Sequence, residues 1–235
     1  MPPPSTGPVP PTGPPAAPLR MSFDEFLAWE HEGGLVEWVE GKVIFHDMPK
    51  ERHQDMVLFL GTLLRVFVQF TVSGKVLIAP FIMRLKESKS GREPDVLFVA
   101  AAHTHRLTEH YLDGPADLVV EVISDDSVTR DRTRKFQEYQ EGGVREYWVI
   151  DPRPGRQQAD FYVLDETGQY RAVLPTAEGI YHSTVLPGFW LRLAWLWEAH
   201  PDLLATLAEV VGTEPLIAAL RGATQAAGKE KRTED

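Results

Sequence analysis

The chain has 235 residues, enough for one domain with a sizeable core but too few for two large ones. Hydrophobic residues make up 43% of it and aromatic residues 10%, as in a folded globular protein. Its 24 basic and 34 acidic residues give a formal net charge of -10, so the field of the whole molecule repels nucleic acid. This balance disfavours a dedicated nucleic-acid-binding module but not an enzyme whose metal ions neutralise an acidic site.

Cysteine is absent from the sequence, which excludes a disulfide framework, a thiolate zinc site and a cysteine nucleophile. A reducing compartment suits such a chain, and we expect the cytoplasm. The N-terminus lacks the apolar stretch of a signal peptide, and no run approaches the roughly 18 apolar residues of a membrane span. We therefore expect no association with a membrane.

The two ends of the chain differ in composition from its middle. Residues 1–20 are mostly proline, glycine, alanine and small polar residues, which predicts a disordered proline-rich leader. Met21 opens a well-patterned segment and is either the true start of the protein or its first structured residue. The main domain is expected over residues 21–198. Residues 199–235 are predicted to form a helical C-terminal extension, with a break near Pro215 and a charged, disordered end.

The first third of the patterned region predicts a helix, a hairpin and a second helix. Ser22 can cap a short amphipathic helix that ends at Gly33–Gly34. The alternation in LVEWVEGKVIF predicts a β-hairpin that turns near Glu40–Gly41. From Arg52 to about Phe70 the apolar residues share one stripe, which indicates a largely buried helix.

The rest of the domain is predicted to supply most of a sheet. Strand-like runs occur at 75–85, 94–101 and 116–124, a central strand at 146–152, and an edge hairpin over 158–175. Ser127 can cap a helix that runs to about Glu141, where Gly142–Gly143 provides a stop signal. The order of elements predicts an α/β fold, with a mixed β-sheet flanked by helices.

Two of these strands carry a carboxylate. Asp95 stands at the start of one, and Glu121 lies inside the apolar run LVVEVIS. Burying an isolated carboxylate is costly, and a divalent cation is one remedy. Mg²⁺ is usually bound by one or two carboxylates, waters and phosphate oxygens, the ligands that a phosphodiester hydrolase needs. The structural alternative is that Asp95 caps a turn and Glu121 pairs with an arginine inside the sheet.

The spacing of these motifs resembles that of a known family. PD at 94–95, EVIS at 121–124 and RDRTRKFQEY at 130–139 are similar to the restriction-endonuclease-like family often called Uma-two, within the PD-(D/E)xK nuclease superfamily. The resemblance extends through GVREYWVIDP and runs from about Phe23 to Leu193, most of the chain. It implies a restriction-endonuclease-like core.

The resemblance also implies a set of site residues. Mg²⁺ or Mn²⁺ would be held by Asp95, Glu121 and the backbone carbonyl of Val122, and a lysine would assist attack by water. In the plain superfamily pattern this lysine stands two residues beyond the glutamate, on the same face of the strand. Ile123 occupies that position here. In the resembling family the lysine lies on the following helix instead, and Lys135 occupies that place.

Lys135 has two interpretations. In the functional one it orients or helps deprotonate the attacking water and stabilises the developing charge. In the structural one Asp131 and Lys135 are an ordinary surface pair four residues apart. The nearby Arg130, Arg132 and Arg134 could contact a phosphate backbone or form a solvated helix face.

Glu37 and His53 match further acidic and histidine positions of the family, so both are candidate site residues. A single histidine on an apolar helix face is, however, often a core residue with satisfied hydrogen bonds. A zinc site at His103, His105 and His110 is disfavoured, because their segment has no HExxH helix pattern and the chain has no cysteine.

Two functions from different classes remain. The first is a metal-dependent endonuclease that hydrolyses DNA phosphodiester bonds. The second is a catalytically inactive nuclease-fold protein that acts as a binding or regulatory module, which the acidic charge favours. A homodimer is compatible with either, given the helical extension. The sequence contains no P-loop, no GxSxG elbow and no GxGxxG after a strand, which disfavours nucleotide-driven and acyl-transfer chemistry.

Overall fold

The computed structural model describes residues 19–30, 35–46, 48–124, 127, 130–219 and 221. Most of the predicted leader and the charged C-terminal end therefore lie outside the described residues. Leu19 and Arg20, the last residues of the predicted leader, lie against the N-terminal hairpin. The Leu19 carbonyl accepts a hydrogen bond of 2.9 Å from the Val43 N–H, and Arg20 forms a β-bridge with Lys42.

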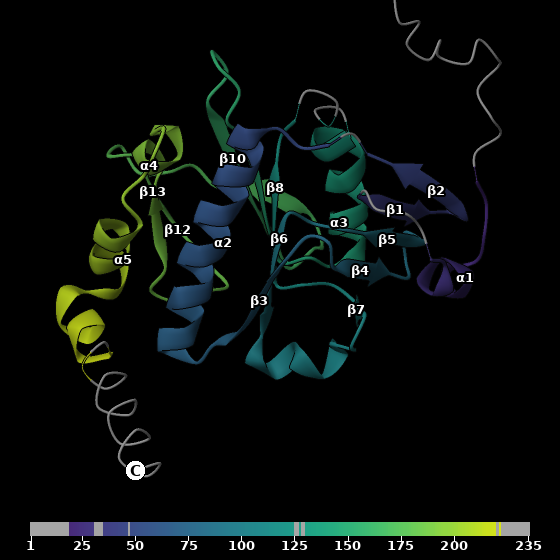
Figure 1. Cartoon of the computed structure of the whole chain (residues 1–235), viewed down its shortest axis with the longest axis horizontal. Helices are drawn as coiled ribbons and strands as arrows, with labels where there is room; N and C mark the ends of the chain where they lie inside the picture. Colours follow the sequence, from purple (N-terminus) through teal and green to yellow (C-terminus); the bar gives the residue numbers. More distant parts are fainter. Residues whose placement is uncertain are drawn as a thin grey trace, which may run out of the picture.

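Helices and groups of strands follow one another along the chain, as in the predicted α/β class (Figure 1). The helices are α1 (Phe23–Ala28), α2 (Glu51–Thr71), the 3₁₀-helix η1 (Ala101–Arg106), the π-helix η2 (Arg130–Lys135), α3 (Phe136–Gly142), α4 (Leu193–Trp197) and α5 (Leu203–Val211). The first strands are β1 (Val36–Val39), β2 (Lys42–Phe45), β3 (Gly74–Ile78), β4 (Ile82–Leu85), β5 (Ser90–Arg92), β6 (Val96–Ala100) and β7 (Tyr111–Asp113). The others are β8 (Leu118–Val122), β9 (Glu146–Asp151), β10 (Gln158–Leu164), β11 (Tyr170–Ala172), β12 (Ile180–His182) and β13 (Trp190–Arg192).

The main sheet is mixed, as predicted. Within the described residues it has six strands in the order β11-β10-β9-β8-β6-β3, in which β8 and β9 pair in parallel and the other neighbours are antiparallel. A second sheet of five strands, in the order β2-β1-β5-β4-β7, was not predicted. The pair β12–β13 forms a separate hairpin.

Both faces of the main sheet are covered, which explains the continuous apolar runs of β6 and β8. Because side chains alternate along a strand, neighbouring residues of β8 enter different cores. Val120 packs in the core that contains α2, whereas Val119 packs in the core that contains Tyr139 of α3. A carboxylate at the end of β6 or β8 is therefore shielded from water by α2 on one face of the sheet and by α3 on the other.

The N-terminal elements follow from their local sequence. Ser22 caps α1 in a capping box, in which its hydroxyl accepts from the Glu25 N–H and the Glu25 carboxylate accepts from the Ser22 N–H. The helix ends at Ala28, before the predicted stop at Gly33–Gly34, which lies outside the described residues. The predicted hairpin turns at Glu40 and Gly41, which have positive φ angles of 49° and 81°. Glycine at the second position adopts such an angle readily, because it has no Cβ.

One sequence expectation about chain breaks was wrong. The run at 75–85 forms two strands in different sheets, separated at Pro80, which cannot donate a backbone hydrogen bond. The break predicted near Pro215 is confirmed, because the C-terminal helices are interrupted at Gly212, which has a φ of 95°. Pro215 lies in the first turn of the next helical segment at 213–219, where a missing N–H costs little.

No helix in the described part of the chain is both long and apolar enough to cross a membrane.

A buried carboxylate, Glu146, ties the β12–β13 region to the main sheet. Glu146 is fully buried at the start of β9. Its oxygens accept hydrogen bonds from the Trp148 indole, the Tyr181 and Ser183 hydroxyls, the Thr184 backbone and hydroxyl, and the Val185 N–H. These donors replace the water that the carboxylate loses on burial.

We expect Glu146→Gln to lower the free energy of unfolding by about 3 kcal/mol, because an amide group turns a donor toward groups that are themselves donors. Urea denaturation followed by tryptophan fluorescence measures the change. Glu141→Gln, at an exposed position on α3, is the matched control. Equal stability of the two variants would show that the network contributes little.

Candidate functional site

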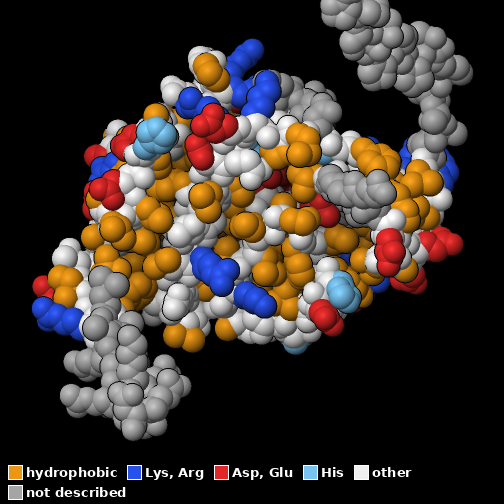
Figure 2. All heavy atoms as spheres, viewed as in Figure 1, with side chains coloured by type: hydrophobic (Ala, Val, Ile, Leu, Met, Phe, Trp, Pro, Cys, Tyr) orange, Lys and Arg blue, Asp and Glu red, His pale blue; other side chains and the backbone are white. Residues whose placement is uncertain are grey.

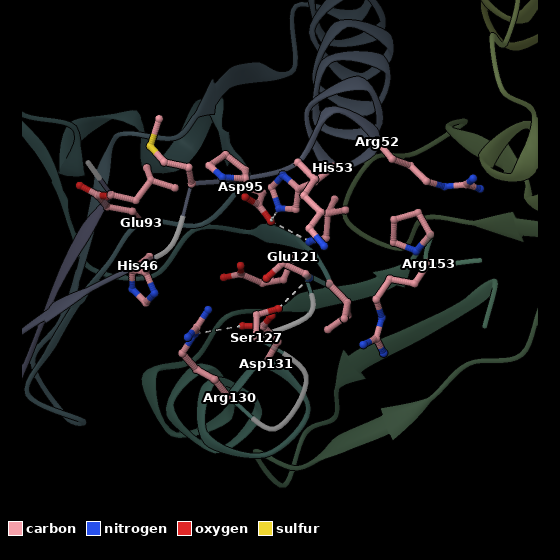
Figure 3. A pocket seen from close by; sticks show the side chains of 18 of the residues that line it. His46, Arg52, His53, Glu93, Asp95, Glu121, Ser127, Arg130, Asp131 and Arg153 are labelled. Carbon is pink, nitrogen blue, oxygen red and sulfur yellow. Dashed lines mark hydrogen bonds and ion pairs between the residues drawn. The ribbon is translucent and has the colours of Figure 1, made fainter. Parts of the chain in front are cut away.

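A cavity of about 540 Å³ lies at the C-terminal end of β8 (Figure 3). Its walls come from the β1–β2 hairpin, the start of α2, the end of β8 and the π-helix η2. All the residues predicted for the site line it, namely Glu37, His53, Asp95, Glu121, Val122 and Lys135. The structure therefore brings together residues that are widely separated in the sequence, although their roles stay predictions.

Asp95 is fixed by the neighbouring strand. Its Oδ2 accepts a hydrogen bond of 2.7 Å from the backbone N–H of Val122, so it ties β6 to β8 rather than capping a turn. The Nε2 of His53 lies 3.3 Å from the same oxygen. Burial alone would lower the pKa of His53, but Asp95 and a hydrogen bond to the Val122 backbone raise it.

Glu121 pairs with a lysine and a tyrosine, not with an arginine. Its Oε1 accepts a hydrogen bond of 2.6 Å from the Tyr139 hydroxyl and lies 2.9 Å from the Nζ of Lys135. Burial, together with repulsion from Asp131 and Asp95, raises the pKa of Glu121 above its ordinary value, although Lys135 opposes this.

Lys135 lies at the centre of three carboxylates. Its Nζ is 3.2 Å from Glu37 Oε1 and 3.5 Å from Asp131 Oδ1, besides its contact with Glu121. Only 4% of Lys135 and 2% of Asp131 is exposed, so the surface-pair interpretation of these two residues is wrong.

The same carboxylates determine the charge of Lys135. Burial alone would lower the pKa of Lys135, but the attraction of Glu121, Glu37 and Asp131 raises it above its ordinary value. Lys135 is therefore an ammonium ion at neutral pH. This favours the orienting and charge-stabilising parts of its predicted role over the removal of a proton from water.

A π-helix presents Asp131 and Lys135 to the cavity. The predicted helix after Ser127 is not α-helical throughout, because residues 130–135 form the π-helix η2 before α3 continues. Wider turns of this kind are frequent at functional sites. Here one such segment buries both members of the pair, and α3 then places Tyr139 against Glu121.

Arg92 was missed by the sequence analysis. It is fully buried on β5, and its Nη1 donates to Glu37 Oε2 at 2.7 Å. Its Nε and Nη2 donate to the two carboxylate oxygens of Glu138, each at 2.7 Å. Together with His46, whose Nε2 is 2.9 Å from Glu37 Oε2, Arg92 fixes the carboxylate that holds Lys135. A strand of three residues has no periodicity that could have indicated this.

The site carries more buried negative than positive charge. Glu37, Glu121 and Asp131 surround Lys135, Asp95 is buried in the same cavity, and Arg92 is shared with Glu138. The buried Oδ1 of Asp131 makes no hydrogen bond to any residue that the structure describes, although two cations lie near it. Such an excess suits a bound cation.

The carboxylates of the cavity can be compared with the ligands that a divalent metal requires. Within the described ranges, no three histidine, aspartate or glutamate side chains form a ready-made metal cluster. Mg²⁺ does not require one, because it uses one or two carboxylates and completes its shell with waters and substrate oxygens. Asp95, Glu121 and Val122 line the same cavity, and their oxygens are donors of the chemical kind that this cation uses.

The other basic and histidine candidates have different surroundings. Arg132 pairs with Asp160, and Arg134 with Glu138, whereas Arg130 lines the cavity. His103 bonds Asp117 and His105 bonds the Ala102 carbonyl, and neither belongs to a metal cluster in the described part of the chain.

Comparison with known proteins identifies the relatives of this chain. A family model described as Uma2, putative restriction endonuclease, matches residues 23–194. The chain belongs to the Uma2 family. No curated protein matches this Uma2 chain.

The fold of this Uma2 protein is shared with a solved structure. That structure is a putative nuclease belonging to DUF820 from Anabaena variabilis ATCC 29413, with a TM-score of 0.62 and 16% sequence identity. The match covers 75% of this chain and 97% of that chain. At this level of identity the likeness shows the fold alone, and it confirms the predicted restriction-endonuclease-like core.

Glu93 is a second site residue of this Uma2 chain that sequence reasoning missed. It lines the cavity near His46, and its buried Oε2 makes no hydrogen bond to a described residue (Figure 3). Burial and repulsion from Glu37 raise the pKa of Glu93 from 4.5 to about 7, although the Val36 backbone and Lys135 oppose this. Its position two residues before Asp95 was the sequence feature that could have indicated a site residue.

We expect Glu93→Gln to weaken the pH dependence of stability in the metal-free protein. Between pH 4.5 and about 7 the folded chain keeps a proton on Glu93 that the unfolded chain has released, so rising pH destabilises the wild type. The glutamine variant lacks this contribution. Thermal unfolding midpoints measured with a chelator across this range test the prediction, with exposed Glu87→Gln as the control. Parallel curves for the wild type and Glu93→Gln would contradict it.

Proposed function

We propose that this Uma2 protein is a metal-dependent endonuclease that hydrolyses phosphodiester bonds in DNA. The observation that carries the proposal is the burial of Asp95, Glu121 and Lys135 beside one another at a single cavity. Membership of a family described as putative restriction endonucleases, together with the nuclease-like fold, supports it.

The cation in this proposal is Mg²⁺ or Mn²⁺, held by Asp95, Glu121 and the Val122 carbonyl. When bound, it would supply positive charge to phosphate oxygens as negative charge develops on them. The contacts described above keep these groups in place. The Val122 N–H and His53 hold Asp95, while Tyr139 holds Glu121.

Lys135 would act by charge and by hydrogen bonding. As an ammonium ion it can donate to the attacking water and to a non-bridging phosphate oxygen, which orients the first and stabilises charge on the second. Glu37 and Asp131 keep it charged, and Arg92 keeps Glu37 in position. The proton released by the water would pass to bulk solvent, because the ammonium group has no free electron pair to accept it.

The second candidate is a catalytically inactive binding or regulatory module. One observation favours it: the proposed ligand oxygens already have partners within the protein. Asp95 Oδ2 accepts from the Val122 N–H, and Glu121 Oε1 contacts both Tyr139 and Lys135. A closed network of this kind could serve stability without a metal.

We expect the purified protein to cleave DNA only with Mg²⁺ or Mn²⁺, and Asp95→Asn, Glu121→Gln and Lys135→Met each to lower the rate at least about 100-fold. Supercoiled, linear and single-stranded DNA should be assayed with proteins prepared in parallel. Asp117→Asn is the matched control, because it changes a buried carboxylate at the opposite end of β8. Unfolding midpoints identify any variant that has lost its fold.

Two outcomes would contradict the nuclease proposal. A folded wild type that cuts no DNA form with either metal would favour the binding module. Cutting that persists in Asp95→Asn at the wild-type rate would come from a contaminant or from a different site.

Calorimetry with Mn²⁺ separates the two candidates without measuring cleavage. An endonuclease should bind Mn²⁺ at one site, and Asp95→Asn should weaken that binding at least about tenfold, because one of the few ligand carboxylates is lost. Asp117→Asn should bind as the wild type does. Equal Mn²⁺ affinity in the wild type and Asp95→Asn would exclude the proposed ligand set.

A further inference from the structure

A second hollow, of about 260 Å³, lies beside the cavity. We call it the side pocket. Its walls are the first turns of α2 and the segment 195–201, which runs from α4 toward α5. Arg52 lines both the cavity and the side pocket. In Figure 3 its side chain points away from Asp95, so it stands between the two spaces.

The side pocket combines an apolar floor with an acidic rim. Met56, Phe59 and Trp195 form part of the floor and are almost completely buried. Glu51, Asp55 and Glu198 place three exposed carboxylates on the rim, which Arg52 and His200 also line. The rim therefore offers hydrogen-bond acceptors above a surface that favours a flat apolar group.

This chemistry excludes some occupants and fits one class. Carboxylates on the rim repel a phosphate, and the space is smaller than the roughly 300–1,000 Å³ of pockets that hold drug-sized ligands. A single nucleobase is a planar ring system that aromatic and apolar side chains can hold. An exocyclic amino group on the base would donate to carboxylates such as Asp55 and Glu198, as cytosine does to acidic side chains.

We propose that the side pocket binds one unpaired, amino-bearing nucleobase of the strand whose phosphodiester lies in the cavity. The inference rests on the proposed function, since it assigns a substrate class to the same site. Arg52, at the junction, would then contact the phosphate that links the two positions.

The surface of the molecule favours an unpaired strand over a duplex. A base inside a duplex is stacked and cannot enter the side pocket unless it is first extruded. On the face seen in Figure 2, basic side chains are scattered among hydrophobic and acidic ones and form no continuous basic patch. With a formal net charge of -10, the chain lacks the field that steers proteins to duplex DNA.

The side pocket lies partly outside the stretch that the family model matches. That match ends at residue 194, whereas residues within 195–201 form one wall of the pocket. Selection of a base would therefore involve residues beyond the matched stretch.

The test compares short oligodeoxycytidine and oligodeoxyuridine strands of equal length, which differ in an amino and a carbonyl group on each base. Binding to the full chain is measured by fluorescence anisotropy with Ca²⁺ in place of Mg²⁺. We expect the cytidine strand to bind at least about fivefold more tightly. Asp55→Ala combined with Glu198→Ala should abolish this preference, because both acceptor carboxylates are removed.

A steric variant provides the matched comparison. Ala199→Trp fills the side pocket from an exposed position and should remove the preference for cytidine. Ala102→Trp makes the same change at an exposed position on η1, near the opposite end of α2, and should keep the preference. Equal binding of the two strands by the wild type, or a preference that survives Ala199→Trp, would overturn the inference.

Cleavage of the same strands with Mg²⁺ distinguishes failure of the side-pocket inference from failure of the proposed nuclease function. Cutting without any base preference would overturn the side pocket but leave the nuclease in place. A preference that Ala199→Trp abolishes, in a protein that cuts nothing, would support the side pocket and overturn the nuclease.

Discussion

The ammonium group of Lys135 is buried among three carboxylates, and the site depends on this constraint. A buried charge is tolerated only when opposite charges surround it closely. Here they come from a hairpin strand, a central strand and a π-helix, through Glu37, Glu121 and Asp131. The three elements must therefore meet at one point, which couples the formation of the site to the packing of the domain.

The ionic network also joins the two sheets. Glu37 and Arg92 belong to the five-stranded sheet, whereas Glu121 belongs to the six-stranded one. Lys135 contacts both acids, so the sheets are linked by charge as well as by the apolar cores on either side. Because the acids outnumber the cations, the same network that holds the sheets together leaves a negative cavity between them.

The sequence predicted the parts of this arrangement that have local signals. Asp95 and Glu121 were recognisable because one stands at the start of an apolar strand and the other lies inside one. The Ser22 cap and the Glu40–Gly41 turn followed from short-range chemistry. Lys135 was chosen through a family resemblance, since spacing alone left a surface pair open. Other features depend on contacts between distant segments or on strands too short to show a period, as with Arg92, the second sheet and the side pocket. The cytoplasmic location and the homodimer stay predictions.

The π-helix η2 places the lysine by a small change in the chain. A π-helical turn arises when one residue is inserted into an α-helix, and each residue of an α-helix turns the side chains by about 100°. The wider turn of η2 places Asp131 and Lys135 in the cavity, and α3 then places Tyr139 against Glu121. A lysine on a helix can therefore stand beside the carboxylate of a strand that has isoleucine two residues beyond its glutamate.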